Sequence, residues 1–381
     1  MRRRYLDNIR WATVVLVVLY HVLYMYNAEG VAGGIGNITG LSIQIYDLYL
    51  YAVFPWFMSI LFIVSGICSK LSLDRYSTRE FIARRTRKLL VPSTIGLLTF
   101  QFIQGYVSMS LLDVWRHVSD VPGIVKFLIM AVSGIGVLWF VQTLWLFSIV
   151  LTLIRKIEKN RLWKICDRIN APTLCLMAIP LWGAAQLLNM PVVVVYRFGL
   201  YATLFLLGYF VFSHERVVDV TKKWFPLFLV FAVAAGIAFC AKNFGKNYAD
   251  APVNRSPLFV GYCWFACLAI LGGMAKYGDF ENAFTRWMNR RSFGLYVFHC
   301  LGISSIALWV AKPGLAPPAC VYLLSLIAGF AAGYLLNALI ARTPFFRQTV
   351  LGFQWGNNND ASRQSDLSSE PEGHDAGKPR C

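Results

Sequence analysis

The stretch LDNIRWATVVLVVLYHV, residues 6–22, combines an apolar run with two ionisable side chains, Arg10 and His21. An α-helix turns about 100° per residue, so eleven steps place His21 within about 20° of Arg10 and about 16 Å further along the same helix face. Ionisable groups inside a bilayer are costly and usually face a bundle interior or a wet cavity. We therefore predict that this helix crosses a membrane and that Arg10 and His21 belong to a functional site.

The composition predicts an all-α integral membrane protein. The 381 residues are 57% hydrophobic and only 14% charged, with a mean hydropathy of +0.55, values that are not typical of a soluble enzyme. A spanning helix needs about 20 apolar residues. Ten stretches approach that length: residues 11–26, 48–68, 89–111, 136–154, 172–188, 192–212, 224–241, 258–275, 293–310 and 319–340. We expect a bundle of about ten transmembrane helices in residues 1–350, followed by a polar, disordered tail in residues 351–381.

The positive charge indicates orientation in a membrane. If the N-terminus is cytoplasmic and the chain crosses ten times, 29 of the 36 Lys and Arg residues fall in cytoplasmic segments and six in outside segments. This asymmetry follows the positive-inside rule and places both termini in the cytoplasm. The net charge of +17 then favours contact with the lipid bilayer and an anionic cytoplasmic ligand, and we predict no nucleic-acid partner.

Metal centres and separate soluble domains are not predicted. The nine Cys residues are scattered, and no CxxC pair or Cys/His cluster supplies a tetrahedral site, so we expect no metal. The predicted loops do not exceed about twenty-five residues, which is too short for a separate catalytic domain. Any chemistry is therefore expected inside the helix bundle.

Five motifs follow one another along the chain. They are Arg-x10-His at residues 10–21, FIVSG at 62–66, FIARRTRKLLVP at 81–92, LWFVQTLWLFS at 138–148 and SFGLYVFHCLGI at 292–303. As an ordered set, covering about residues 5–350, they resemble acyltransferase family 3, a family of integral membrane acyltransferases. The resemblance implies transfer of an acyl group, most often acetyl, from cytoplasmic acyl-coenzyme A to a hydroxyl of a carbohydrate or glycolipid, commonly across the membrane. It also implies a multi-pass protein of the bacterial cytoplasmic (inner) membrane that modifies polysaccharides.

The catalytic residues implied by the resemblance are His21 and Arg10. A neutral imidazole can accept the proton of the acceptor hydroxyl while its oxygen attacks the thioester, although His21 could instead take the acyl group itself. A buried His satisfied by a carbonyl is the structural alternative. Arg10 could bind phosphate or steady the site, or it could be an ordinary cation at the cytoplasmic end of the helix.

The donor-binding residues implied by the resemblance are the basic cluster Arg84, Arg85, Arg87 and Lys88. Guanidinium groups bind phosphates in a bidentate manner, and coenzyme A carries several phosphates. The family pattern is Arg-x-x-Arg, which this chain matches as Arg84 with Arg87 or, aligned on the following LLVP, as Arg85 with Lys88. Both pairings stay open, as does a role of the cluster in topology alone.

Three further residues are predicted to bind substrate, namely Trp139, His299 and Ser65. Trp139 could stack on a sugar or on the pantetheine arm, or anchor a helix end at the membrane interface. His299 could line the cavity. Ser65 precedes Gly66, which favours close helix packing, although a nucleophilic serine is the alternative.

A transporter or flippase of a glycan or small metabolite is the competing function, since a helix bundle with a polar interior also describes a transport pathway. Against it, the two halves of the chain show no repeated pattern of interrupted helices. A receptor or scaffold would leave a deeply placed His21 unexplained. The identity of the acceptor and the oligomeric state stay open.

Overall fold

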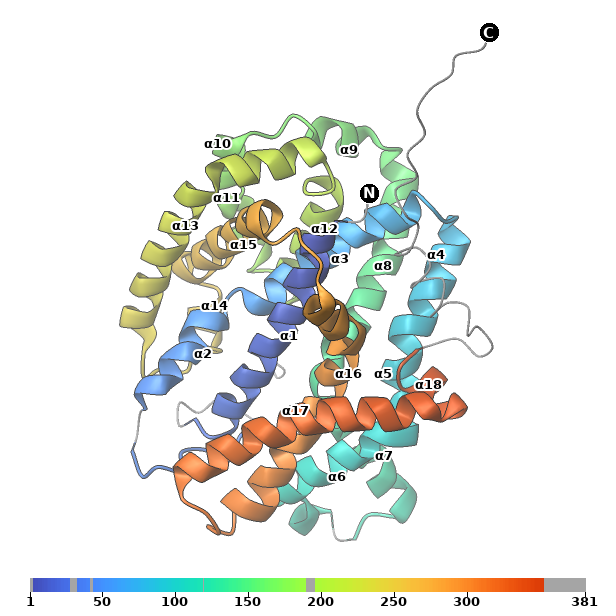
Figure 1. Cartoon of the computed structure of the whole chain (residues 1–381), viewed down its shortest axis with the longest axis vertical. Coiled ribbons are helices and arrows are strands. Elements are labelled where there is room, and N and C mark those ends of the chain that lie inside the picture. Colours follow the sequence, from blue (N-terminus) through green and yellow to red (C-terminus); the bar gives the residue numbers. More distant parts are fainter. Residues whose placement is uncertain (1–2, 28–32, 42–43, 119, 190–195, 353–381) are drawn as a thin grey trace.

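The computed structural model describes residues 3–27, 33–41, 44–118, 120–189 and 196–352, and every regular element in these ranges is a helix (Figure 1). A single residue pair, Asn189 and Arg197, forms an isolated antiparallel bridge. The prediction of an all-α protein is confirmed. The predicted tail lies outside the described residues from residue 353 onward.

Seven helices in the described part of the chain are long and apolar enough to cross a membrane. They are α1 (Arg4–Met25); η1 (Ile45–Asp47) with α2 (Leu48–Val53) and α3 (Phe57–Leu73); η5 (Gly136–Leu138) with α8 (Trp139–Glu158); α13 (Glu215–Asn243); α15 (Pro257–Tyr277); α16 (Ala283–Ile306) with η6 (Ala307–Ala311); and α17 (Pro318–Arg342). Each overlaps one predicted span. The other three predicted spans fall on shorter or interrupted helices, so the count of about ten is not confirmed.

The predicted span 89–111 belongs to an interrupted helical run. Its segments are α4 (Thr78–Arg85), η2 (Thr86–Leu90), α5 (Val91–Gly96), η3 (Leu97–Gln101) and α6 (Phe102–Leu111), and η2 and η3 are π-helical. Pro92, in the first turn of α5, has no N–H to continue the α-helical ladder, which accounts for the change of helix type before it. The basic cluster lies at this irregular turn, and π-helical turns are frequent at functional sites.

The remaining helices are short. They are η4 (Val114–His117), α7 (Gly123–Ser133), α9 (Arg161–Cys166), α10 (Ala171–Leu176), α11 (Ala178–Ala184), α12 (Phe198–Phe210), α14 (Ala251–Asn254) and α18 (Pro344–Thr349). The predicted span 172–188 corresponds to α10 and α11. The predicted span 192–212 corresponds to α12, and its residues up to 195 lie outside the described part of the chain.

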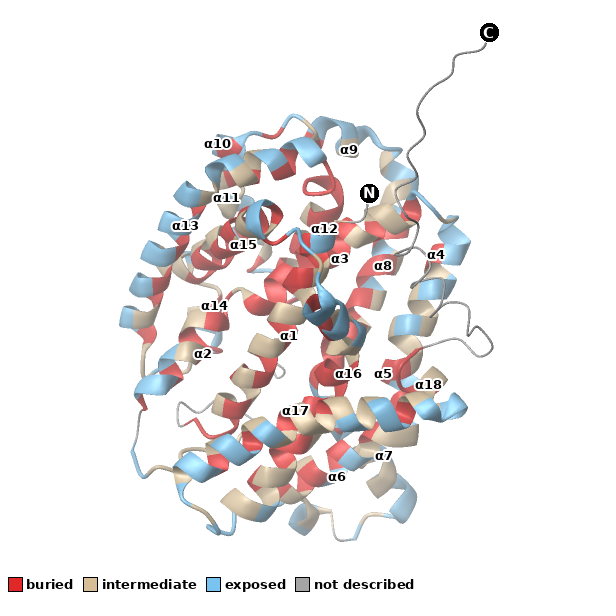
Figure 2. Cartoon of the chain, viewed as in Figure 1, coloured by how far each residue is buried: buried red, intermediate tan, exposed pale blue. Residues whose placement is uncertain are grey.

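The outer helices expose apolar side chains, as α13 shows. Its most apolar window has a mean hydropathy of 2.2, yet only 22% of that window is buried, compared with 89% for the window within Ile45–Leu73 (Figure 2). Leu229, Val230 and Ile237 on α13 are among the exposed residues. An apolar surface of this extent is unfavourable in water but matches lipid. The chain is therefore a multi-pass membrane protein.

The core is formed by α1, which packs against α3, α16 and α17, and by α3, which crosses α12 at very short range. A Cβ atom on Gly66 of α3 would lie 2.0 Å from the backbone oxygen of Phe205, and one on Gly208 of α12 would lie 2.1 Å from that of Ile63. Only glycine permits this approach, as in other membrane helix pairs. The Ser-Gly motif therefore contributes to helix packing.

Candidate active site

The first turns of α1 are hydrogen-bonded to another segment of the protein, and these bonds position the rest of the helix, including His21. The side-chain amide of Asn8 donates to the carbonyls of Gly278 and Phe280, at 2.7 and 2.8 Å. The backbone N–H of Tyr5 donates to Asp279 Oδ1 at 2.9 Å. These contacts hold α1 against the segment after α15. The single unbroken helix also confirms that Arg10 and His21 share α1 at the predicted spacing.

His21 lies near the end of α1 and is partly exposed. Its Nδ1–H donates to the carbonyl of Val17, one turn earlier, at 2.8 Å. The rings of Tyr20 and Tyr24 stand edge-on to the imidazole, with centroids 5.3 and 6.0 Å away. The hydroxyl of Tyr20 is itself hydrogen-bonded to that of Tyr248 at 3.0 Å. The imidazole is thus held by one backbone bond and flanked by aromatic rings.

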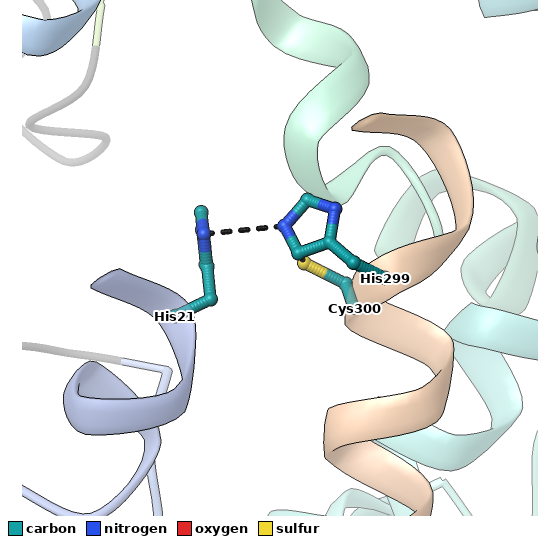
Figure 3. Close-up of side chains that lie close together, drawn as sticks. All are labelled: His21, His299 and Cys300. Carbon is teal, nitrogen blue, oxygen red and sulfur yellow. Dashed lines mark hydrogen bonds between the residues drawn. The ribbon is translucent and has the colours of Figure 1, made fainter. Parts of the chain in front are cut away.

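His299 of α16 faces His21 directly. His299 is fully buried, and its Nε2 lies 3.3 Å from His21 Nδ1 (Figure 3). Its own Nδ1–H donates to the carbonyl of Leu295 at 3.0 Å. The thiol of Cys300, the next residue, lies 3.4 Å from His299 Nε2. Two imidazoles and one thiol therefore meet at the contact of α1 with α16.

The hydrogen bonds define which nitrogen carries the proton on each neutral ring. A carbonyl only accepts, so the bonds to Val17 and Leu295 place the protons of His21 and His299 on Nδ1. The lone pair of His299 Nε2 then faces the Nδ1–H of His21. The second nitrogen of His21, Nε2, keeps a lone pair that neither Val17 nor His299 uses. This nitrogen is positioned to accept a proton from another molecule.

Near the N-terminal end of α1, Arg10 pairs with Asp7 at 3.2 Å and its side chain is 41% exposed. Arg85 donates to Ser69 Oγ of α3 at 2.8 Å. Burial lowers the pKa of Arg85 to about 10, and the nearby positive charge of Arg10 acts in the same direction. Arg85 therefore stays charged at neutral pH beside a second cation. Two neighbouring guanidinium groups favour an anionic ligand.

The other three members of the basic cluster are at least partly exposed. Arg84 is exposed, and its guanidinium lies 3.9 Å above the ring of Tyr76. Lys88 is exposed and Arg87 partly exposed. Of the two pairings that the motif leaves open, the one containing Arg85 has a member directed towards α1 and α3. The sequence does not indicate that Arg10 lies beside Arg85, because the two residues come from different helices.

Trp139 is buried at the start of α8 among other aromatic rings. Its ring centroid lies 6.3 Å from that of Phe62, 5.9 Å from Tyr196 and 5.7 Å from Tyr201. Its position is internal, and its role in binding substrate stays a prediction.

Ser65 lies on α3 and is largely buried. Its backbone carbonyl accepts a hydrogen bond from Ser69 Oγ at 2.8 Å. The described contacts bring Ser65 to none of the imidazoles, so its assignment as a substrate residue rests on the motif alone. An apolar groove of about 590 Å³, between residues 48–56, α13 and α15, likewise includes none of the predicted site residues.

Arg197 is a charge whose partner the sequence does not reveal. It is only 4% exposed, and its Nη2 donates to the hydroxyl of Tyr201 at 2.5 Å. Its guanidinium also lies about 5 Å from the ring centroids of Phe54 and Phe259. Aromatic rings therefore surround this cation.

The chain matches the family model of the acyltransferase domain, acyltransferase family 3, over residues 3–338. The chain belongs to acyltransferase family 3. This confirms the resemblance drawn from the ordered motifs, and the match covers all seven apolar helices almost to the end of α17. No curated protein and no solved structure matches the chain significantly. Cys300 is the one member of the histidine contact that is not among the site residues predicted from the sequence.

Proposed function

We propose that this family 3 acyltransferase transfers an acetyl group from cytoplasmic acetyl-coenzyme A to a hydroxyl of a carbohydrate or glycolipid. The observation that carries the proposal is the tautomer of His21. Its Nδ1–H is held by the Val17 carbonyl, which leaves the Nε2 lone pair available as a general base. Acceptor hydroxyls need such a base because they are weak nucleophiles at neutral pH.

In the proposed step, His21 Nε2 takes the hydroxyl proton as the acceptor oxygen attacks the thioester carbonyl carbon. A carbon–oxygen bond forms and the carbon–sulfur bond breaks. The proton then passes to the departing coenzyme A thiolate, so that the imidazole returns to its starting state. His299 Nε2, at 3.3 Å from His21 Nδ1, shares that N–H with the Val17 carbonyl and stabilises the imidazolium that forms transiently.

The basic residues at the cytoplasmic end support an acyl-coenzyme A donor. Arg10 and Arg85 are neighbouring cations suited to phosphate groups, and Arg84, Arg87 and Lys88 extend the positive charge outward. Arg10 and His21 are about 16 Å apart along α1. An extended pantetheine arm therefore suffices to bring a thioester from the phosphate-binding end to the imidazole.

The aromatic walls support a sugar acceptor. Tyr20 and Tyr24 flank His21, and aromatic rings offer flat apolar faces with polar edges that suit the faces of a pyranose. The acceptor site then lies near the end of α1 opposite the basic cluster. This arrangement supports an acceptor, such as a polysaccharide, on the far side of a bacterial inner membrane. No observation among the described residues favours a transporter.

The test is thiol release from acetyl-coenzyme A by purified protein in lipid nanodiscs, with and without a crude glycan pool. We expect acceptor-dependent release, and His21→Ala should lower it by about 10²- to 10⁴-fold, as for the loss of other general bases, while donor binding persists. The matched control is His117→Ala, since His117 is exposed on η4. Equal losses in both variants, or full activity of His21→Ala, would contradict the role of His21.

A further inference from the structure

We propose that His21, His299 and Cys300 together bind one Zn²⁺ ion and that this ion inhibits the acyltransferase. Each residue offers one ligand atom, and the three atoms lie within 4.8 Å of one another. Imidazole nitrogen and thiolate sulfur are the donors that Zn²⁺ and other soft divalent ions prefer. Spacing rules cannot detect this group, because His21 precedes the other two ligands by 278 residues or more.

Two of the three distances within the group match those of a tetrahedral site, and the third pair, the ligand atoms of His21 and Cys300, lies within 4.8 Å. With Zn–N bonds of about 2.0–2.1 Å and Zn–S bonds of about 2.3 Å, two nitrogens are about 3.4 Å apart and a nitrogen and a sulfur about 3.6 Å apart. The observed separations are 3.3 Å between His21 Nδ1 and His299 Nε2 and 3.4 Å between His299 Nε2 and Cys300 Sγ. Small side-chain movements therefore suffice, and the fourth position is left to water.

The hydrogen bonds already orient one ligand for the ion. His299 donates its Nδ1–H to the carbonyl of Leu295, and a metal-binding histidine typically uses its second nitrogen in this way. The lone pair of Nε2 consequently points at Cys300 and His21. Cys300 and His21 are both partly exposed, so neither ligand is fully enclosed by the helix bundle.

Binding changes the protonation of the other two ligands. The Cys300 thiol loses its proton to solvent, because a coordinated thiol is deprotonated. His21 moves its proton from Nδ1 to Nε2 and gives up the bond to Val17. The net charge of the ion and its ligands is then +1 instead of +2, which lowers the cost of placing it inside the bundle.

Inhibition follows from the new tautomer of His21, and this part of the inference rests on the proposed function. Once Nδ1 coordinates the ion, Nε2 carries the proton and has no lone pair for the acceptor hydroxyl. The base is thus lost without any change in the donor site at Arg85. Zn²⁺ should therefore lower the maximal rate and leave the affinity for acetyl-coenzyme A unchanged.

The first test measures binding without activity, by titrating the purified full chain in nanodiscs with Cd²⁺ and recording the ultraviolet charge-transfer absorption of a Cd²⁺–thiolate bond. We expect one saturable site that Zn²⁺ displaces. Cys300→Ser and Cys300→Ala should both lose this absorption, whereas Cys320→Ser, which alters an exposed cysteine of α17, should keep it. Absence of the saturable site, or its persistence in both Cys300 variants with intact size-exclusion profiles, overturns the proposal.

The second test measures the concentration of Zn²⁺ that halves each variant's own activity. Loss of a group that merely orients a ligand weakens metal binding by about 10- to 100-fold, so Cys300→Ser should raise this concentration by at least about tenfold relative to Cys320→Ser. Saturable binding in a protein without acyl transfer would refute the proposed function but keep the metal site. Acyl transfer that resists Zn²⁺ would refute the inhibition and leave the function standing.

Discussion

Replacing Gly66 with Ala tests whether the Phe-x-x-Ser-Gly motif serves helix packing. A Cβ atom at this position would lie 2.0 Å from the backbone oxygen of Phe205 and 2.9 Å from the backbone nitrogen of Tyr209. Ordinary contact begins near 3.4 Å, so the oxygen must recede by roughly 1.4 Å. Overpacking costs about 1–3 kcal/mol, and the better helix propensity of Ala offsets about 1 kcal/mol. Because backbone atoms cannot rotate away, we expect a net loss of about 2 kcal/mol.

The assay is thermal unfolding of the protein in nanodiscs, followed by intrinsic tryptophan fluorescence. Gly261→Ala is the matched control, because no heavy atom lies within 4 Å of a Cβ atom there, and it should be unchanged or more stable by up to about 1 kcal/mol. If Gly66→Ala unfolds at the same temperature as Gly261→Ala, the close crossing of α3 and α12 is refuted. A loss of acyl transfer in Ser65→Ala at unchanged stability would instead favour a chemical role of the motif.

Three further outcomes concern the two ends of the site and the start of α4. In a calorimetric titration, Arg85→Ala should weaken acetyl-coenzyme A binding by about tenfold or more, since a charge-assisted hydrogen bond contributes about 1.5–3 kcal/mol. Arg84→Ala should weaken the same binding by less. His299→Leu should lower kcat by about tenfold, because Leu cannot accept a hydrogen bond from His21, at unchanged donor affinity; an unaltered kcat would contradict this. A hydrogen bond from the Ser77 backbone N–H holds the pKa of Glu80 below its ordinary value of 4.5. Wild type should therefore be more stable than Glu80→Ala above pH 4.5, and thermal unfolding should show this difference disappearing as the pH falls below 4.5.

The parts of the site that lie on one helix could be predicted from the sequence. Arg10 and His21 share α1 because a long apolar run dictates a continuous helix, and helix periodicity then determines their relative position. The interrupted run around Pro92 was harder to predict, since hydropathy detects an apolar segment but not a change of helix type. Hydropathy also predicts more spans than the seven long apolar helices of the described residues, because short helices have the same apolar composition as spanning ones.

The contact of His21 with His299 shows where sequence reasoning ends and why. Each imidazole bonds to a carbonyl one turn earlier, an option that any helix provides, so the position of each proton follows from local structure alone. The partner of each ring depends on how α1 packs against α16, and no local pattern encodes that crossing. Cys300 enters the site only through this packing. A cysteine that is not among the site residues predicted from the sequence thus becomes, by one helix contact, a proposed ligand beside the proposed base. The Cd²⁺ titration measures whether these ligands meet in the membrane.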